Sequence, residues 1–206
     1  MKLLITIICL ATFLSAGKYD KVKITEELSQ VLVYHKGKAV KIHRIQDVKN
    51  HLTGSYAKIS RPCPDKCIQP ISIGNGIETI GEVEVVEFVK NQVNHHKGVL
   101  VDARPKNMYA QETIPAAINI PFTISNNNVA IKSIFEILGM TINPDSSWDS
   151  SKALDVVVYC NGPWCEKSKT LIDAFLREGY PAKKIFYYRG GFQMWKSLGL
   201  TTVKTK

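Results

Sequence analysis

No apolar run of 18 or more residues follows the extreme N-terminus, which excludes a protein with several membrane-spanning helices. The 206 residues include only 13 glycines and 9 prolines, too few for a collagen-like or low-complexity chain, and 45% hydrophobic residues are too many for general disorder. Basic residues outnumber acidic ones by 27 to 18. They form no dense run interleaved with aromatic residues, so we expect no nucleic acid partner.

The first 17 residues have the pattern of a secretory signal peptide. Lys2 is followed by an apolar stretch over residues 3–14 and by small residues at 15–17. The stretch is too short to cross a bilayer comfortably, although an uncleaved anchor helix is the alternative interpretation. We therefore expect a periplasmic or secreted protein with no stable membrane insertion after signal cleavage. Cleavage would remove Cys9 and leave four cysteines.

These four cysteines form two close pairs, Cys63 with Cys67 and Cys160 with Cys165. In an oxidising compartment such residues usually form disulfides, and the sequence leaves all three connectivities open. Prolines flank Cys63, so a local disulfide or an inert loop is the leading interpretation for the first pair, with a second thiol relay as the alternative. Both spacings are wider than the common gap of zinc sites, and we predict no metal and no cofactor.

Two regions of the mature chain differ in their patterning. Residues 18–75 are predicted to form a small β-rich accessory module, because apolar runs at residues 31–34 and 39–42 flank a Gly-containing turn, as in a β-hairpin. Residues 71–78 are expected to be a linker.

From residue 79 onward the pattern predicts an α/β fold, with a parallel sheet flanked by helices. Thr79 and Glu82 fit a capping box at the start of a helix. Strands are expected at residues 99–102, 117–120, 156–159 and 184–188, and further helices at residues 131–138, 166–177 and 191–198. The run at 156–159 is apolar on both faces, which is typical of a central parallel strand.

Chemistry is expected where this apolar strand stops at Cys160. A short loop with Gly162 and Pro163 leads from there into a helix. The carboxyl end of a parallel strand faces the ligand crevice of an open sheet. Loop amides and the positive end of the helix stabilise anions and lower the pKa of a thiol. We therefore expect an ionised, reachable thiolate at Cys160, with the loop amides up to Cys165 stabilising an anionic intermediate.

Four segments resemble, in the same order, motifs of the rhodanese family of sulfurtransferases. Residues 99–104 are similar to its strand with a following Asp and Arg, and residues 109–121 to its stretch ending in A-x-N-I-P. The loop from Cys160 and the G-G-x-x-x-W element within residues 188–195 complete the set. The resemblance covers residues 79–202 and implies a rhodanese-like parallel sheet flanked by helices.

The resemblance also implies roles for individual residues. Cys160 would accept sulfane sulfur as a persulfide and pass it to a thiophilic acceptor, while Asp102 and Arg104 would form a structural ion pair at a strand end. Many active rhodaneses carry Arg or Lys at the last loop position, where this chain has Cys165. The loop is similar to the C-x-G-P-x-C loop of exported rhodanese-like proteins. Residues 61–70 resemble a module found ahead of some of them.

The second loop cysteine leaves three functions open. As a resolving thiol, Cys165 would attack a persulfide on Cys160, and in the alternative interpretation it would only lock the loop in a disulfide. As a redox protein, the chain would cycle a Cys160–Cys165 disulfide. As a binding module, it would use the rhodanese fold without catalysis. Phosphatase chemistry is disfavoured, because Glu166 stands near the place where an Arg would bind phosphate.

The sequence therefore predicts a sulfurtransferase whose catalytic residues are Cys160 and Cys165. The expected partners are a small sulfur anion or persulfide donor, and a thiol acceptor or redox partner protein. The expected substrate-binding loop consists of Asn161, Gly162, Pro163, Trp164 and Lys167.

Overall fold

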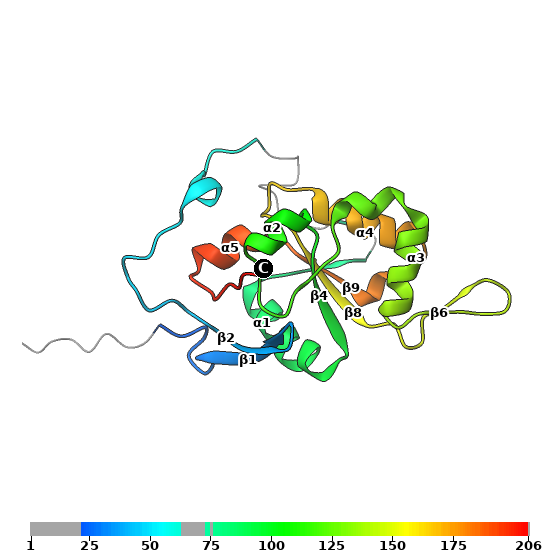
Figure 1. Cartoon of the computed structure of the whole chain (residues 1–206), viewed down its shortest axis with the longest axis horizontal. Coiled ribbons are helices and arrows are strands. Elements are labelled where there is room, and N and C mark those ends of the chain that lie inside the picture. Colours follow the sequence, from blue (N-terminus) through cyan, green and yellow to red (C-terminus); the bar gives the residue numbers. More distant parts are fainter. Residues whose placement is uncertain (1–21, 63–72, 75, 206) are drawn as a thin grey trace, which may run out of the picture.

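A computed structural model describes residues 22–62, 73–74 and 76–205, and its centre is a five-stranded sheet (Figure 1). The strand order is β3-β9-β8-β4-β5, and all neighbouring strands are parallel. The strands are β3 Glu78–Ile80, β4 Gly98–Asp102, β5 Ile118–Asn119, β8 Asp155–Tyr159 and β9 Ile185–Tyr188. The α/β fold and the central position of β8 confirm the prediction from apolar patterning.

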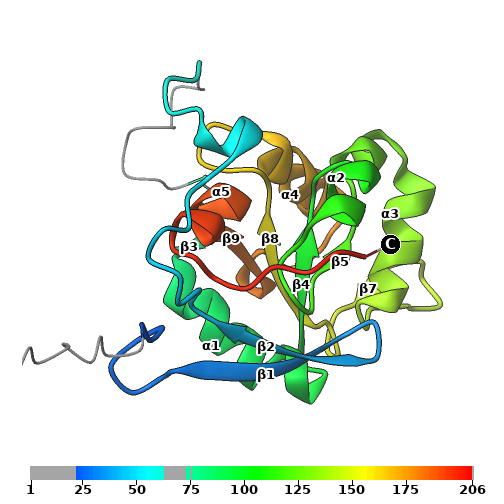
Figure 2. The same cartoon turned by 60° about the vertical axis from the view of Figure 1, so that its left-hand side comes forward.

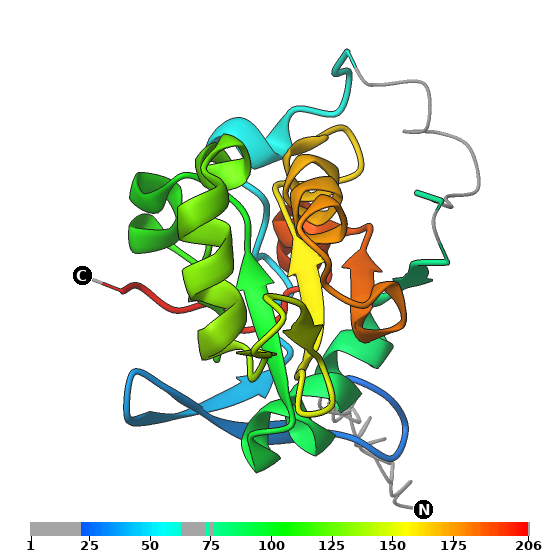
Figure 3. The same ribbon diagram turned by 90° about the vertical axis from the view of Figure 1, so that its right-hand side faces the viewer.

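Helices cover both faces of this sheet (Figure 3). They are α1 Glu82–Asn91, α2 Lys106–Gln111, α3 Asn128–Ile137, α4 Lys167–Arg177 and α5 Gly191–Ser197. Successive side chains of β8 point to opposite faces of the sheet and therefore belong to two separate cores. Val156 and Val158 pack with side chains of α3 and α4, whereas Val157 and Tyr159 pack with side chains of α1 and α5.

An antiparallel hairpin forms the predicted N-terminal β structure (Figure 2). It consists of β1 Gln30–His35 and β2 Lys38–His43, joined by Lys36 and Gly37, both of which have positive φ angles. This conformation suits the twist of a two-residue hairpin turn. The hairpin buries Val31, Val33 and Ile42 in the same core as α1 and α5. The proposed boundaries at residues 75 and 79 remain predictions.

Two local expectations are corrected. Thr79 lies within β3 and pairs with β9, so the capping box predicted at Thr79 and Glu82 is wrong. The helix is capped at Gly81, whose N–H donates to the carboxylate of Glu84 at 3.1 Å. Glu78, assigned by its sequence to a linker, belongs to the same strand. Such a short edge strand has too few residues to show an alternating pattern.

The sequence also gave no signal for α2 or for the small hairpin of β6 Thr141–Ile142 and β7 Trp148–Asp149. The predicted signal peptide and the pair Cys63 and Cys67 lie outside the described residues. Within the described ranges, no helix has the length and apolar character needed to cross a bilayer.

Candidate functional site

The loop after β8 brings the two predicted catalytic cysteines together. Cys160 follows the last residue of β8, and Cys165 stands two residues ahead of the first residue of α4. Their sulfurs form a disulfide across a Cα–Cα distance of 6.4 Å. The N–H of Cys165 donates to the carbonyl of Gly162 at 3.0 Å, which closes the loop in a tight turn. The sequence left the partner of each cysteine open, and the structure pairs Cys160 with Cys165.

This disulfide form differs from the expected reachable thiolate. Cys160 is 2% exposed and Cys165 is 7% exposed. A disulfide sulfur carries no ionisable proton, so the lowered thiol pKa stays a prediction about the reduced protein. Reduction must come before any nucleophilic attack by Cys160.

The first turn of α5 holds the beginning of the loop. The N–H of Phe192 donates to the carbonyl of Cys160 at 2.9 Å, and the N–H of Gln193 donates to that of Asn161 at 2.8 Å. Gly191 makes this approach possible. Its φ is +58°, and a Cβ there would lie 2.6 Å from the Cys160 carbonyl oxygen. The Gly-Gly element thus serves the site by allowing two backbones to touch.

Trp164 packs over the loop and is held from two sides. Its indole N–H donates to the side-chain oxygen of Gln193 at 2.5 Å. The guanidinium of Arg61 lies 4.0 Å from its ring centroid. Gly162 leaves room for the indole, because a Cβ at this position would lie 2.8 Å from the Trp164 ring nitrogen.

The remaining predicted loop residues take different positions. Asn161 is buried, whereas Pro163 and Lys167 are half-buried. Lys167 is the first residue of α4, and its ammonium lies 4.8 Å from the ring centroid of Phe122. The predicted cation is thus placed over an aromatic ring at the start of the helix.

Asp102 and Arg104 form a buried ion pair beside the loop. Arg104 Nε donates to Oδ1 of Asp102 at 2.9 Å, and Nη2 donates to Oδ2 at 2.6 Å. Thr113 and Tyr159 donate to the same Oδ2 at 2.8 and 3.0 Å. Burial alone would lower the pKa of Arg104, but the hydrogen bonds and charge of Asp102 outweigh it, and the net shift is upward. Arg104 therefore remains charged.

Tyr56, which the sequence did not single out, joins this ion pair to the loop. Its hydroxyl accepts from Nη1 of Arg104 at 2.9 Å and donates to Oδ1 of Asn161 at 3.2 Å. Tyr56 lies in the short 3-10 helix Gly54–Ala57, ahead of β3 in the chain. It precedes Asn161 by 105 positions, and no local pattern could have indicated the contact.

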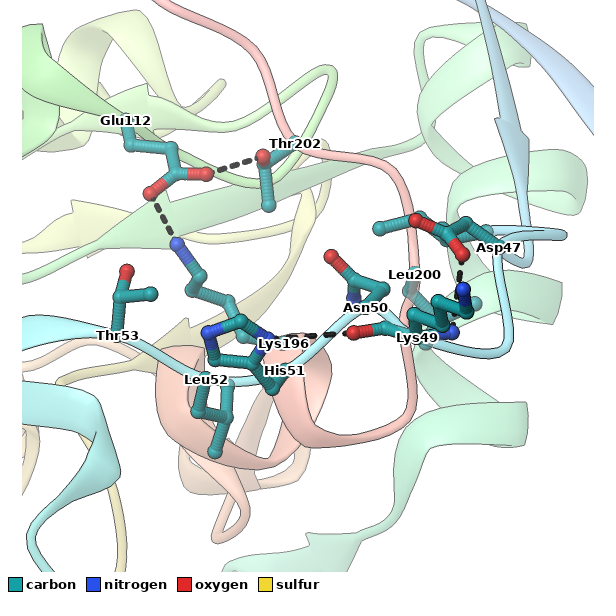
Figure 4. A pocket seen from close by; sticks show the side chains of 11 residues that line it. Asp47, Lys49, Asn50, His51, Leu52, Thr53, Glu112, Lys196, Leu200 and Thr202 are labelled. Atoms are coloured by element: carbon teal, nitrogen blue, oxygen red, sulfur yellow. Dashed lines mark hydrogen bonds and ion pairs between the residues drawn. The ribbon is translucent and has the colours of Figure 1, made fainter.

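A polar cavity of about 380 Å³ adjoins this network (Figure 4). Its lining includes an ion pair of 2.5 Å between Glu112 and Lys196, and Thr202 donates to the other carboxylate oxygen at 2.5 Å. None of its lining residues is a predicted site residue. The backbone carbonyl of Glu112 accepts from Arg104 at 2.6 Å. Arg104 therefore contacts both the wall of this cavity and the network beside the cysteine loop.

Comparison with protein families matches residues 85–198 to the Rhodanese-like domain. Comparison with curated proteins gives no match. Among solved structures, a Bacillus halodurans protein is 21% identical, with a TM-score of 0.46 over 62% of this chain and 77% of that one.

Two further solved structures carry descriptive names. A rhodanese with anions from E. coli is 23% identical, with a TM-score of 0.33 over 52% of this chain and 98% of that one. A single-domain sulfurtransferase from Saccharomyces cerevisiae is 18% identical, with a TM-score of 0.43 over 60% and 91%. All three TM-scores are below 0.5, so the family assignment depends on the sequence match alone.

Proposed function

This chain belongs to the Rhodanese-like domain family, and on that premise we propose that it transfers sulfane sulfur as a persulfide on Cys160. One observation carries the proposal: Cys160 stands at the carboxyl end of the central strand, bonded to a second cysteine across a six-residue loop. The carboxyl ends of parallel strands are where open α/β sheets bind their ligands.

The first step is reduction of the disulfide by an external thiol. Two thiols deliver two electrons and two protons, the Cys160–Cys165 bond breaks, and the reductant leaves as its own disulfide. Reduction frees the Cys160 sulfur, which is buried in the oxidised form. A reducing partner protein or a small dithiol is therefore part of the proposal.

In the second step the Cys160 thiolate attacks the outer sulfur of a persulfide donor. The donor's S–S bond breaks, its electron pair leaves with the donor thiolate, and Cys160 becomes a persulfide. The loop residues orient this group. Asn161 is held by Tyr56, and the Cys160 carbonyl is held by the N–H of Phe192.

The persulfide then has two outcomes. An acceptor thiolate takes the outer sulfur and regenerates the Cys160 thiolate. Alternatively, the Cys165 thiolate attacks the inner sulfur, expels hydrosulfide and restores the disulfide. The second outcome reduces sulfane sulfur to sulfide at the expense of the two cysteine thiols.

Intact-protein mass spectrometry tests this proposal. The reduced protein is treated with a polysulfide as the sulfane donor. The wild type should release sulfide and lose two hydrogens as the disulfide re-forms. Cys165→Ser should retain one added sulfur, because the resolving thiol is gone. Cys160→Ser should retain no added sulfur on the peptide that contains positions 160 and 165, because the accepting thiol is gone.

A second candidate is redox cycling without sulfur transfer, which the Cys160–Cys165 disulfide favours. It predicts that mild oxidation removes two hydrogens only when both cysteines are present, and that Cys165→Ser gains no sulfur. The absence of any added sulfur on Cys165→Ser would therefore contradict the sulfurtransferase proposal and leave the redox function.

A further inference from the structure

Tyr56 lies ahead of the segment that matches the family, yet it contacts the loop between the two cysteines. Its hydroxyl bonds with Asn161 and Arg104, as described above. Its backbone carbonyl also accepts from the side-chain nitrogen of Gln193 at 3.1 Å. Three hydrogen bonds thus connect one N-terminal residue to the loop, to the buried ion pair and to α5.

The aromatic ring of Tyr56 is held as well. It lies edge-on against Phe192, with the ring centroids 5.4 Å apart. The ammonium of Lys196 lies 5.5 Å from its centroid. Burial raises the pKa of the Tyr56 hydroxyl, which keeps the proton that it donates to Asn161. Removing the hydroxyl alone therefore leaves the packing of the ring in place.

We propose that Tyr56 is a positioning residue for the Cys160–Cys165 pair, acting through the side chain of Asn161. Asn161 directly follows Cys160, so a bond to its side chain restricts the loop that must close before the two sulfurs meet. A loop that is already ordered loses less conformational entropy on closure. The hydrogen bond from Tyr56 therefore favours the disulfide over the two thiols.

In this way a segment outside the family match completes the cysteine site. The inference rests on the proposed function only in taking Cys160 and Cys165 as the reacting pair. It does not require that sulfur be transferred, because closure of the disulfide is common to both candidate functions.

The test is a redox titration of the full chain against reduced and oxidised glutathione. Two glutathione thiols reduce the protein disulfide to two thiols and leave as one glutathione disulfide. The state of Cys160 and Cys165 is read by alkylation and mass spectrometry of the peptide that contains both. Tyr56→Phe should lower the equilibrium constant for disulfide formation about three- to tenfold, the effect of losing one hydrogen bond.

Tyr34→Phe is the matched control, because Tyr34 is exposed on the hairpin and its loss of a hydroxyl should leave the equilibrium unchanged. A double-mutant cycle with Asn161→Ala tests whether Tyr56 acts through the side chain of Asn161. Once the acceptor is gone, Tyr56→Phe should have no further effect.

An unchanged equilibrium in Tyr56→Phe would overturn the proposal, and so would a full effect of Tyr56→Phe in the Asn161→Ala background. Glutathione exchange needs no sulfane donor, so this result is independent of the persulfide experiment. A shifted equilibrium without sulfur gain on Cys165→Ser would reject the sulfurtransferase function and keep the role of Tyr56.

Discussion

The two faces of the central sheet are covered by different parts of the chain. On one face, α3 and α4 pack against the sheet, with Phe135, Leu171 and Phe175 fully buried. On the other face, α1 and α5 are joined by the N-terminal hairpin, which buries Val33 and Ile42 there. The hairpin is thus part of the core on the face whose helix α5 also holds the cysteine loop.

The N-terminal hairpin is connected to the cysteine site through the core that it shares with α5. The face with α3 and α4 is built mainly from residues within the family match, whereas the face with α5 also needs segments ahead of it. The ion pair of Asp102 and Arg104 lies on the α5 side, with the guanidinium 4.0 Å from the Phe192 ring centroid. Changes on this side should therefore disturb the fold and the cysteine loop together.

Asp102→Ala should have the largest effect. It leaves the Arg104 guanidinium buried without its carboxylate, and removing one partner of a buried ion pair costs about 3–5 kcal/mol. Urea unfolding measures the loss of unfolding free energy. Glu87→Ala is the control, since Glu87 pairs with Lys90 at the surface and should cost less than about 0.5 kcal/mol. Similar losses for both variants would contradict the structural role of the buried pair.

Gly191→Ala should have the next largest effect. It should lower the free energy of unfolding by about 2–4 kcal/mol, because the backbone is strained and the new methyl group overlaps with the loop. Gly37→Ala has a similar positive φ of +75°, but open space surrounds its Cβ, so strain alone should cost about 1 kcal/mol. The difference between the two variants measures the close approach of α5 to Cys160. Equal losses in urea unfolding would show that the contact with the loop adds nothing.

One valine substitution on each face of the sheet tests directly whether the two faces unfold together. Val33 in the hairpin and Val158 in β8 are both fully buried, on opposite faces of the sheet. Each Val→Ala change should cost about 1.5–3 kcal/mol, from the lost methyl groups and the cavity left behind. Global unfolding in urea, followed by tryptophan fluorescence, provides the comparison. An effect confined to Val158→Ala would mean that the hairpin unfolds separately from the sheet.

The smallest effect should be a pH dependence that originates in the hairpin. Burial, aided by the charge of Lys36, lowers the pKa of His35 below its ordinary value of 6.5. The unfolded chain therefore binds more protons than the folded one below about pH 6.5, and stability falls as the pH drops. The contribution of the neutral His35 side chain to stability is fully present above that pH.

Urea midpoints at about pH 7.5 and pH 5.5 should differ more in the wild type than in His35→Gln, which removes the titrating group. His95→Gln, at an exposed position, is the control. If His35→Gln retained the whole pH dependence of the wild type, the hairpin histidine would not be its source.

Much of the fold followed from local patterns. The apolar run before Cys160 predicted a central parallel strand, and the Gly-containing turn after Tyr34 predicted the hairpin. Errors occurred where elements are short. The strand containing Thr79 has three residues and a single neighbouring strand, so its pairing with β9 prevailed over the capping signal in the sequence.

The candidate site was predictable only in part. The positions of Cys160 and Cys165 on one loop followed from their spacing, and the ion pair of Asp102 and Arg104 from the family resemblance. The contact between Tyr56 and Asn161 had no sequence signal. Hydrogen bonds across about a hundred positions depend on which segments cover the sheet, and neither periodicity nor turn chemistry reports that.

By itself, the sequence determined that Cys160 ends a buried strand, because hydrophobic runs and loop-forming residues act within a few positions of one another. Only the tertiary structure decided that the sulfurs of Cys160 and Cys165 are bonded and buried, and that Tyr56 reaches the loop that holds them. Those contacts exist because packing brings distant segments to one edge of the sheet, where their polar groups must find partners once water is excluded.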